Sequence, residues 1–313
     1  IKSGRDLEGL QKMIPSRNIV VQNVRFLADD TIALGSEASG GVRNVFIEDS
    51  VGTDLRKGFY FKANKNRGSH FEHIRIRNLT FGDLADVPEN RRKLAMIEVT
   101  TNYDSTGVSY NRNPEFKDIR LENIIGGTSI YPVILDGTDE VPLKDFVLDN
   151  VHLGAGEKPN TIRFIDNETM FFRNMTVGNQ PLRALVDDAK ESTLIPQSAN
   201  IPPDVYAGEE QSISLAQGNS ILLSGDAIDI DNDPMTFQWQ AVSANAESVS
   251  MGEDAEGNNL YYPFGDETNV RFSNLNDLKT EVFFDHPGTY RLRLNVTDGK
   301  ATGYHTVFIE VRR

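Results

Sequence analysis

The sequence predicts an all-β protein of two parts, a right-handed parallel β-helix (solenoid) followed by an immunoglobulin-like β-sandwich. The first observation is a strand pattern, apolar-x-apolar-x-Asn/Asp, that recurs six times within the first 180 residues. The second is the loss of this repeat in a segment rich in Gly, Pro, Gln and Ser near residue 195. The third is a series of short alternating strands around the sole Trp, between residues 201 and 313. We therefore expect domains at residues 1–195 and 196–313.

The six repeated segments alternate apolar and polar residues with a period of two, which buries one face of each strand. They span residues 18–23, 44–49, 73–78, 118–123, 145–150 and 169–174. The intervals between their last residues are 24 to 29 in four of five cases and 45 in the fifth, where one repeat carries a long inserted loop. A single repeat cannot bury its apolar face alone, whereas stacked repeats bury a continuous core. This spacing predicts the parallel β-helix, with an irregular β-sandwich as the alternative.

The Asn or Asp that closes each segment has a predicted structural role. These residue types tolerate left-handed backbone geometry, and their side chains hydrogen-bond to nearby backbone at turns. We therefore expect them to share one corner of the stacked repeats, where each side chain contacts its neighbours.

Residues 196–313 show the spacing of short strands that is typical of a β-sandwich. Trp239 is placed as the buried Trp of a third strand, and Tyr290 is placed as a tyrosine corner. The segments Pro202-Pro-Asp-Val-Tyr-Ala-Gly208 and Leu223-Ser-Gly-Asp-Ala-Ile-Asp229, with the strand that ends in Asp298-Gly299, resemble PKD and related immunoglobulin-like modules of secreted bacterial proteins. That resemblance implies a spacer, or a module that contacts carbohydrate or a partner.

Three aspartates, Asp229, Asp231 and Asp233, alternate along one short stretch of this second part. Because calcium takes carboxylate oxygens from closely spaced aspartates, they could hold a structural calcium ion. The alternative is an acidic, Asx-rich turn before Pro234, which we favour because the order of ligands is not that of an EF-hand. The chain requires no other cofactor on this interpretation.

Charge and composition limit the classes of function. The chain has 313 residues, long enough for two domains, and a formal net charge of −14. Because a nucleic-acid binder needs a basic face to contact phosphates, this charge argues against nucleic-acid partners and against docking on anionic lipid. No apolar run approaches the ~20 residues needed to cross a bilayer. Zero cysteines exclude disulfides, thiolate metal sites and cysteine nucleophiles.

Two histidines, His70 and His73, lie three residues apart, a spacing that could suggest a metal site. On a strand this spacing points the two rings to opposite faces. We therefore expect both to be surface residues and not ligands.

The run Gly35-Ser-Glu-Ala-Ser-Gly-Gly-Val-Arg-Asn44, preceded by Asp29 and Asp30, resembles the family 28 glycoside hydrolases, the polygalacturonases. The resemblance extends over about residues 1–180 and corresponds to the later coils of that fold. It implies hydrolysis of pectic or related uronic-acid polymers with inversion at the anomeric carbon, by aspartates that donate a proton and activate water. Inversion needs carboxyls roughly 6.5–9.5 Å apart, a separation that strands ~4.8 Å apart can supply.

The correspondence with the family is partial at the level of single residues. Asp29 stands where the family has the histidine of Gly-His-Gly. Tyr60-Phe-Lys62 stands where it has Arg-Ile-Lys, so the lysine is retained and the arginine is lost. Arg67 corresponds to an Arg-Gly turn, and Tyr103 resembles a tyrosine that lines the cleft. The family's Asn-x-Asp and Asp-Asp motifs would precede Ile1.

These comparisons define the candidate site. The candidate catalytic carboxylates are Asp29 and Asp30, and the candidate substrate-binding residues are Tyr60, Lys62, Arg67, Tyr103 and Glu37. Three interpretations stay open: the C-terminal part of a longer or split enzyme, a relocated active site on the aspartate pair, and a non-catalytic carbohydrate-binding or adhesin-like solenoid. The first implies a missing N-terminal segment or partner over the open end of the solenoid. The expected partner is a pectic or other acidic glycan, and the expected location is secreted, extracellular or periplasmic.

Overall fold

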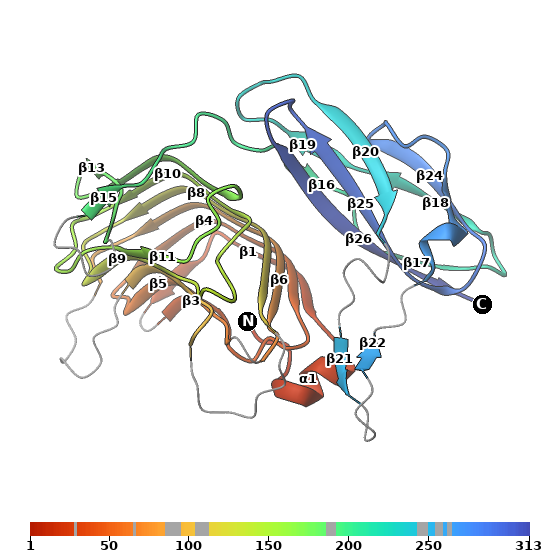
Figure 1. Cartoon of the computed structure of the whole chain (residues 1–313), viewed down its shortest axis with the longest axis horizontal. Helices are drawn as coiled ribbons and strands as arrows, with labels where there is room; N and C mark the ends of the chain where they lie inside the picture. The colour runs from red at the N-terminus through yellow and green to blue at the C-terminus, as the bar shows by residue number, and fades with distance from the viewer. Residues whose placement is uncertain are drawn as a thin grey trace. The chain divides into compact units, whose positions relative to one another are not determined.

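The structure is a computed structural model that describes residues 1–27, 30–64, 67–84, 95–103, 113–185, 192–242, 250–253, 259–261 and 265–313. The chain divides into two compact units, Ile1–Ala199 (unit 1) and Asn200–Arg313 (unit 2), whereas the sequence analysis placed the boundary after residue 195. The described elements of both units are β-strands apart from one α-helix and one 3₁₀ helix, which confirms the predicted all-β class (Figure 1).

Unit 1 begins with helix α1 (Asp6–Lys12), which is followed by two β-sheets (Figure 1). Most successive strands of the chain alternate between these two sheets. The first sheet contains, in spatial order, β1 (Ser16–Gln22), β4 (Val42–Thr53), β6 (His70–Phe81), β8 (Glu115–Gly126), β10 (Phe146–Leu153), β12 (Met170–Val177) and β13 (Gln180–Pro181), with β2 (Arg25–Leu27) also paired to β4. The second sheet contains β3 (Asp30–Gly35), β5 (Lys57–Lys62), β7 (Ala95–Thr100), β9 (Tyr131–Asp136), β11 (Thr161–Arg163), β14 (Arg183–Leu185) and β15 (Ser192–Leu194). Neighbouring strands are parallel except at β12–β13 and β14–β15.

The register of the strands places equivalent apolar residues beside one another. Ile47 pairs with Ile76, Ile76 with Leu121, Leu121 with Leu148 and Leu148 with Phe172. All five side chains are buried in one core that lies between the two sheets and extends through the whole unit. Each repeat therefore depends on its neighbours to cover its apolar face.

The residues that close the repeated segments form a ladder at one corner of unit 1. Backbone φ angles between 48° and 58° are found at Asn23, Asp49, Asn78, Asn123, Asn150 and Asn174. Their side chains are joined from repeat to repeat: Asn78 donates to Asp49 at 2.9 Å, Asn123 to Asn78 at 3.0 Å and Asn150 to Asn123 at 2.8 Å. The predicted shared corner is confirmed.

A second ladder lies at the start of the same segments, where the sequence analysis did not predict one. Positive φ angles of 53° to 59° occur at Asn18, Asn44, His73, Asp118 and Asp145. Strands β4, β6 and β8 thus bend twice instead of ending at the Asn or Asp, because their backbone pairing continues on both sides of each left-handed residue. The expected surface position of His73 is wrong: its side chain is buried and Nδ1 lies 2.8 Å from Asp118.

The main sheet of unit 2 has two long central strands with a shorter strand at each edge. It contains β17 (Gln211–Ser214), β26 (Thr302–Arg312), β25 (Gly288–Thr297) and β20 (Thr236–Ala241). A second sheet contains β18 (Ser220–Ser224), β24 (Lys279–Phe284) and β23 (Val270–Phe272). The pairs β16 (Asp204–Tyr206) with β19 (Asp226–Ile228) and β21 (Ser250–Glu253) with β22 (Asn259–Tyr261), and the 3₁₀ helix η2 (Glu267–Asn269), complete the described elements.

Two aromatic residues anchor the core of unit 2 in the manner expected from the sequence. Trp239 is fully buried, and its indole Nε1 donates a 2.8 Å hydrogen bond to the carbonyl of Asp277. The Tyr290 hydroxyl donates a 2.8 Å hydrogen bond to the carbonyl of His286, four residues upstream. Both contacts satisfy the polar end of a side chain whose ring is otherwise enclosed by apolar residues.

Candidate functional site

The outer face of the second sheet of unit 1 brings together most of the candidate site residues that the structure describes. Phe59 and Phe61 point into the core, so Tyr60 and Lys62, which alternate with them on β5, point to the opposite face. The register places Tyr60 beside Glu98 of β7 and Lys62 beside Thr100. Residues from separate repeats therefore lie side by side on this face of the sheet, where Tyr60, Glu98 and Thr100 are buried.

A buried ion pair lies at the start of β5. The Lys57 ammonium group donates a 2.5 Å hydrogen bond to the Glu98 carboxylate and lies 3.4 Å from the centroid of the Tyr60 ring. Burial lowers the pKa of Lys57, while the charge and hydrogen bond of Glu98 oppose this shift. Burial and the adjacent Glu98 carboxylate both raise the pKa of Tyr60 well above its usual range. Tyr60 is therefore a neutral hydroxyl at all physiological pH values.

Lys62 lies beside two aromatic rings. Its ammonium nitrogen is 4.7 Å from the centroid of Tyr60 and 5.5 Å from that of Tyr103, and the two rings meet edge to face at 5.9 Å. The Asp30 carboxylate is 4.0 Å from Lys62 and accepts a 3.4 Å hydrogen bond from Arg56. Tyr103 is 40% exposed, so this group of residues reaches solvent.

Two other candidate substrate-binding residues, Glu37 and Arg67, belong to a separate polar cluster beside α1. The Arg67 guanidinium lies 2.9 Å from the Asp6 carboxylate, and the residue is only 4% exposed. Glu37 forms a 2.7 Å ion pair with Lys2, whose hydrogen bond and charge lower the pKa of the Glu37 carboxyl. Both side chains therefore form ion pairs with other residues of the protein.

Asp29, the other candidate catalytic residue, lies outside the described residues.

The sequence analysis did not single out Lys57, Glu98 or Arg56. Glu98 carries a signal that could have been used, because it is the one charged residue in the otherwise uncharged strand Ala95–Thr100. A charged side chain within an apolar strand needs a partner, since burying an unpaired charge is costly. Nothing in the local sequence names Lys57 as that partner, because the two residues are 41 positions apart.

In unit 2 the three aspartates proposed for calcium make separate contacts. Asp229 Oδ1 accepts hydrogen bonds from the backbone amides of Asp231 and Asp233, as in an Asx turn. Asp231 accepts from the amide of Ile201, and Asp233 forms a 2.5 Å ion pair with Lys300. Within the described parts of the chain, no group of three or more His, Asp or Glu side chains is arranged to hold a metal ion.

The arrangement on the outer face combines cations, a neutral tyrosine hydroxyl, exposed aromatic surface and carboxylates. Lysines pair with carboxylate groups of ligands, and aromatic rings contact the apolar faces of polar molecules. Such a set of residues suits an extended, acidic, hydroxyl-rich ligand.

Among the described residues, no helix is long and apolar enough to cross a membrane.

Comparison with known proteins finds similarity between part of this chain and part of a curated protein. No protein-family model matches the chain. The chain is similar to a probable polygalacturonase from Vitis vinifera, with 27% identity over 165 residues, which is 50% of this chain. The match spans 32% of the length of that relative.

Two solved structures show a likeness to part of the chain. One is the PKD domain from KIAA 1837 protein, with 18% identity and a TM-score of 0.24, covering 37% of this chain and 92% of the other. The other is the PKD domain of human KIAA0319, with 14% identity and a TM-score of 0.24, covering 38% of this chain and 91% of the other. These values do not establish a shared fold.

Proposed function

We propose that the chain belongs to a polysaccharide-degrading glycoside hydrolase of the polygalacturonase type, and that unit 1 is a right-handed parallel β-helix. Two observations support this. Successive strands alternate between two parallel sheets and pair with their counterparts in the next repeat. The similarity to a probable polygalacturonase points to the same class of reaction.

The observation that carries the proposal is the position of Lys62 between Tyr60 and Tyr103 on the outer face of the second sheet. On this proposal the Lys62 ammonium group pairs with the carboxylate of a uronic-acid residue, and the exposed ring of Tyr103 contacts a sugar face. Charge-assisted hydrogen bonds of this kind are stronger than neutral ones. The Asp30 carboxylate lies 4.0 Å from the Lys62 ammonium nitrogen. On this proposal, the carboxylate of a ligand approaches that nitrogen more closely than Asp30 does.

Hydrolysis with inversion requires one carboxyl that protonates the leaving oxygen and another that activates water. We assign Asp30 to this pair, with Asp29 as its proposed partner. Arg56 and Lys62 both lie near Asp30 and hold its carboxylate in position, so we assign Asp30 as the base that activates water. Asp29 would then be the proton donor.

A specific observation favours the alternative, a non-catalytic carbohydrate-binding or adhesin-like solenoid or an inactive fragment of a longer enzyme. Both described carboxylates on this part of the outer face, Asp30 and Glu98, are in ion pairs with the protein's own cations. A carboxylate held in this way can position a lysine for binding without taking part in proton transfer. Binding of an acidic polymer is common to both interpretations, whereas hydrolysis belongs only to the first.

We further propose that unit 2 is a PKD-like or immunoglobulin-like β-sandwich and that the protein is secreted. The buried Trp239 and the Tyr290 hydroxyl bound to the His286 carbonyl support the sandwich. A calcium ion near Asp229 stays a proposal. Addition of calcium or of a chelator should change the thermal unfolding midpoint if the ion is bound, and should leave it unchanged otherwise.

The test measures two quantities on the full chain: retardation in native gels that contain polygalacturonate, and release of reducing ends from the same polymer. We expect retardation and slow release, and we expect release to be lost in Asp29→Asn/Asp30→Asn. The matched control is Asp54→Asn, because Asp54 is an exposed carboxyl at a left-handed position where Asn is equally tolerated.

Each outcome separates the interpretations. Retardation without release of reducing ends favours the binding solenoid. Release that persists in the double variant contradicts the assignment of the aspartates. Absence of both, in protein shown to be folded by circular dichroism, contradicts the proposed ligand class.

A further inference from the structure

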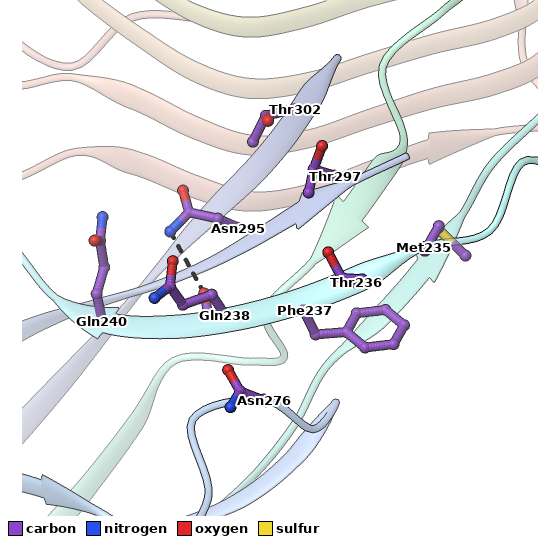
Figure 2. A pocket seen from close by; sticks show the side chains of 9 residues that line it. All are labelled: Met235, Thr236, Phe237, Gln238, Gln240, Asn276, Asn295, Thr297 and Thr302. Carbon is purple, nitrogen blue, oxygen red and sulfur yellow. Dashed lines mark hydrogen bonds between the residues drawn. The ribbon is translucent and has the colours of Figure 1, made fainter. Parts of the chain in front are cut away.

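A pocket of about 740 Å³ lies in unit 2, along strand β20 of the main sheet (Figure 2). Its described lining consists of Met235, Thr236, Phe237, Gln238, Gln240, Asn276, Asn295, Thr297 and Thr302. Trp239 lies in the core between two of these residues, so the neighbouring Gln238 and Gln240 point away from the core. The pocket therefore opens on the polar side of the sheet.

The lining is rich in side-chain amides and hydroxyls and contains no charged side chain among its described residues. Four side chains are carboxamides, and three are threonines. A carboxamide presents a donor and an acceptor side by side, which matches a ligand hydroxyl or a pair of neighbouring hydroxyls. An uncharged lining of this kind favours a neutral polar ligand over an anion or a cation.

The register of the sheet groups these polar side chains. Gln238 lies directly across from Asn295, and Thr236 lies across from Thr297. The Asn295 amide nitrogen donates a 3.4 Å hydrogen bond to the backbone carbonyl of Gln238, which orients the Asn295 side chain beside the strand (Figure 2). Within the described part of the chain, the side-chain amides of Gln238 and Gln240 make no hydrogen bond to protein, and both residues are exposed.

Two apolar residues of the described lining, Met235 and Phe237, alternate with its polar residues along the chain. Met235 and Phe237 are partly buried and pack against the core of unit 2, so they are held in place. Figure 2 shows the Phe237 side chain leaving β20 on the side away from Thr297. Phe237 is in phase with Trp239 and faces the core side of β20, so the side chains of Thr236, Gln238 and Gln240 remain to recognise a ligand. Their hydrogen-bond donors and acceptors match the hydroxyl groups of a saccharide.

We propose that this pocket binds a neutral polysaccharide. The absence of a cation from its described lining and the net charge of −14 both disfavour a uronic-acid polymer there. All described lining residues belong to unit 2, so this proposal is independent of the function proposed for unit 1. Unit 2 then holds the protein on an uncharged glycan, whatever unit 1 binds.

The experiment is affinity electrophoresis of the full chain in native gels that contain soluble galactomannan, xyloglucan or arabinogalactan. We expect retardation by at least one of these neutral polymers, and we expect it to persist at high salt, because no charge pair is involved. Gln238→Ala/Gln240→Ala should weaken binding about tenfold, which is the loss expected for two neutral hydrogen bonds. Asn276→Asp, which adds a charge without changing volume, should also weaken it.

The matched control is Gln217→Ala, which removes an exposed amide from a turn outside the pocket. Its retardation should equal that of the unaltered chain. Lys62→Ala should also leave binding of the neutral polymer unchanged, which separates this site from the one proposed in unit 1. The proposal is overturned if none of the neutral polymers retards the folded chain, or if the double variant and Asn276→Asp bind as tightly as Gln217→Ala.

Discussion

The ammonium group of Lys57 and the carboxylate of Glu98 lie 2.5 Å apart, and their side chains are only 9% and 6% exposed. They belong to neighbouring strands of the second sheet, β5 and β7, so the pair joins two repeats. The Lys57 ammonium also lies 3.4 Å from the centroid of the Tyr60 ring, so the pair contacts a residue of the candidate site. The pair therefore holds part of the candidate site in position.

Breaking this pair should destabilise unit 1. Lys57→Met leaves the Glu98 charge buried without its partner, and the free energy of unfolding should fall by about 3–5 kcal/mol. Glu98→Gln should have a similar effect, while Lys57→Met/Glu98→Gln should lose less than the sum of the two. Urea unfolding followed by circular dichroism measures these differences. Arg312→Met, which removes one partner of the exposed pair with Glu310, should leave the unfolding midpoint unchanged.

Lys62 should dominate the binding of acidic polymers. Lys62→Ala removes one charge-assisted hydrogen bond, and affinity for polygalacturonate should fall roughly 10- to 100-fold. The remaining binding should also depend less on salt, because a charge pair has been lost. The control is Lys144→Ala, which removes an exposed lysine of the same unit. If the two variants lost affinity equally, general charge and not the aromatic setting of Lys62 would account for binding.

The environment of His70 predicts a specific dependence of stability on pH. Its Nε2 lies 3.1 Å from Glu72 and its Nδ1 lies 3.2 Å from Glu115, which also pairs with Lys117. Burial acts to lower the pKa of His70, but the hydrogen bonds and charges of Glu115 and Glu72 outweigh it and raise the pKa above its ordinary value of 6.5. Folding therefore favours the imidazolium form.

The stability that comes from this raised pKa is fully present below pH 6.5 and is lost as the pH rises through the higher folded-state value. His70→Gln should consequently destabilise the protein most below pH 6.5, and the difference from the unaltered chain should shrink as the pH rises. Thermal unfolding midpoints over a pH series measure this. His286→Gln, at an exposed histidine of unit 2, should show no such trend. A constant difference for His70→Gln at all pH values would contradict the assignment.

The asparagine ladder should contribute through both its backbone geometry and its hydrogen bonds. Asn123 has φ of 56°, donates to Asn78 and accepts from Asn150. Asn123→Ala loses both hydrogen bonds and places a side chain with a Cβ in the left-handed region, so we expect a loss of about 2–4 kcal/mol. Asn123→Gly loses the same hydrogen bonds but adopts this φ without steric cost, and should be less destabilising. Equal losses for the two variants in urea unfolding would show that the left-handed φ does not contribute to the destabilisation.

Much of the architecture of unit 1 follows from local sequence. Each segment alternates apolar and polar residues, and Asn78 and Asn123 lie at the ladder positions that their spacing predicts. The second ladder was missed because its members differ in chemical type, including Asn44, His73 and Asp118. The left-handed conformation at His73 is sustained by a contact with Asp118 of the next repeat, which a local pattern does not contain.

Some residues of the candidate site lie where the sequence pattern predicts them, and others do not. Tyr60 and Lys62 share the face to which the alternation of β5 assigns them. Asp30 and Tyr103 come from other repeats and lie beside Lys62 only in the tertiary structure. Arg67 was assigned to the same surface, but its guanidinium is buried against Asp6 near α1. No periodicity in the sequence encodes this contact, because Arg67 and Asp6 are far apart in the chain.

The sequence by itself determined the β-strands of unit 1, the repeat that relates them and the corner residues of the first ladder, because each depends on residues close together in the chain. It also determined the buried Trp239 and the bound hydroxyl of Tyr290 in unit 2. Only the tertiary structure decided that Lys57 and Glu98 form a buried pair and that Lys62 lies between two tyrosines. Such contacts depend on the register between repeats, which is set by the packing of whole strands against a common core.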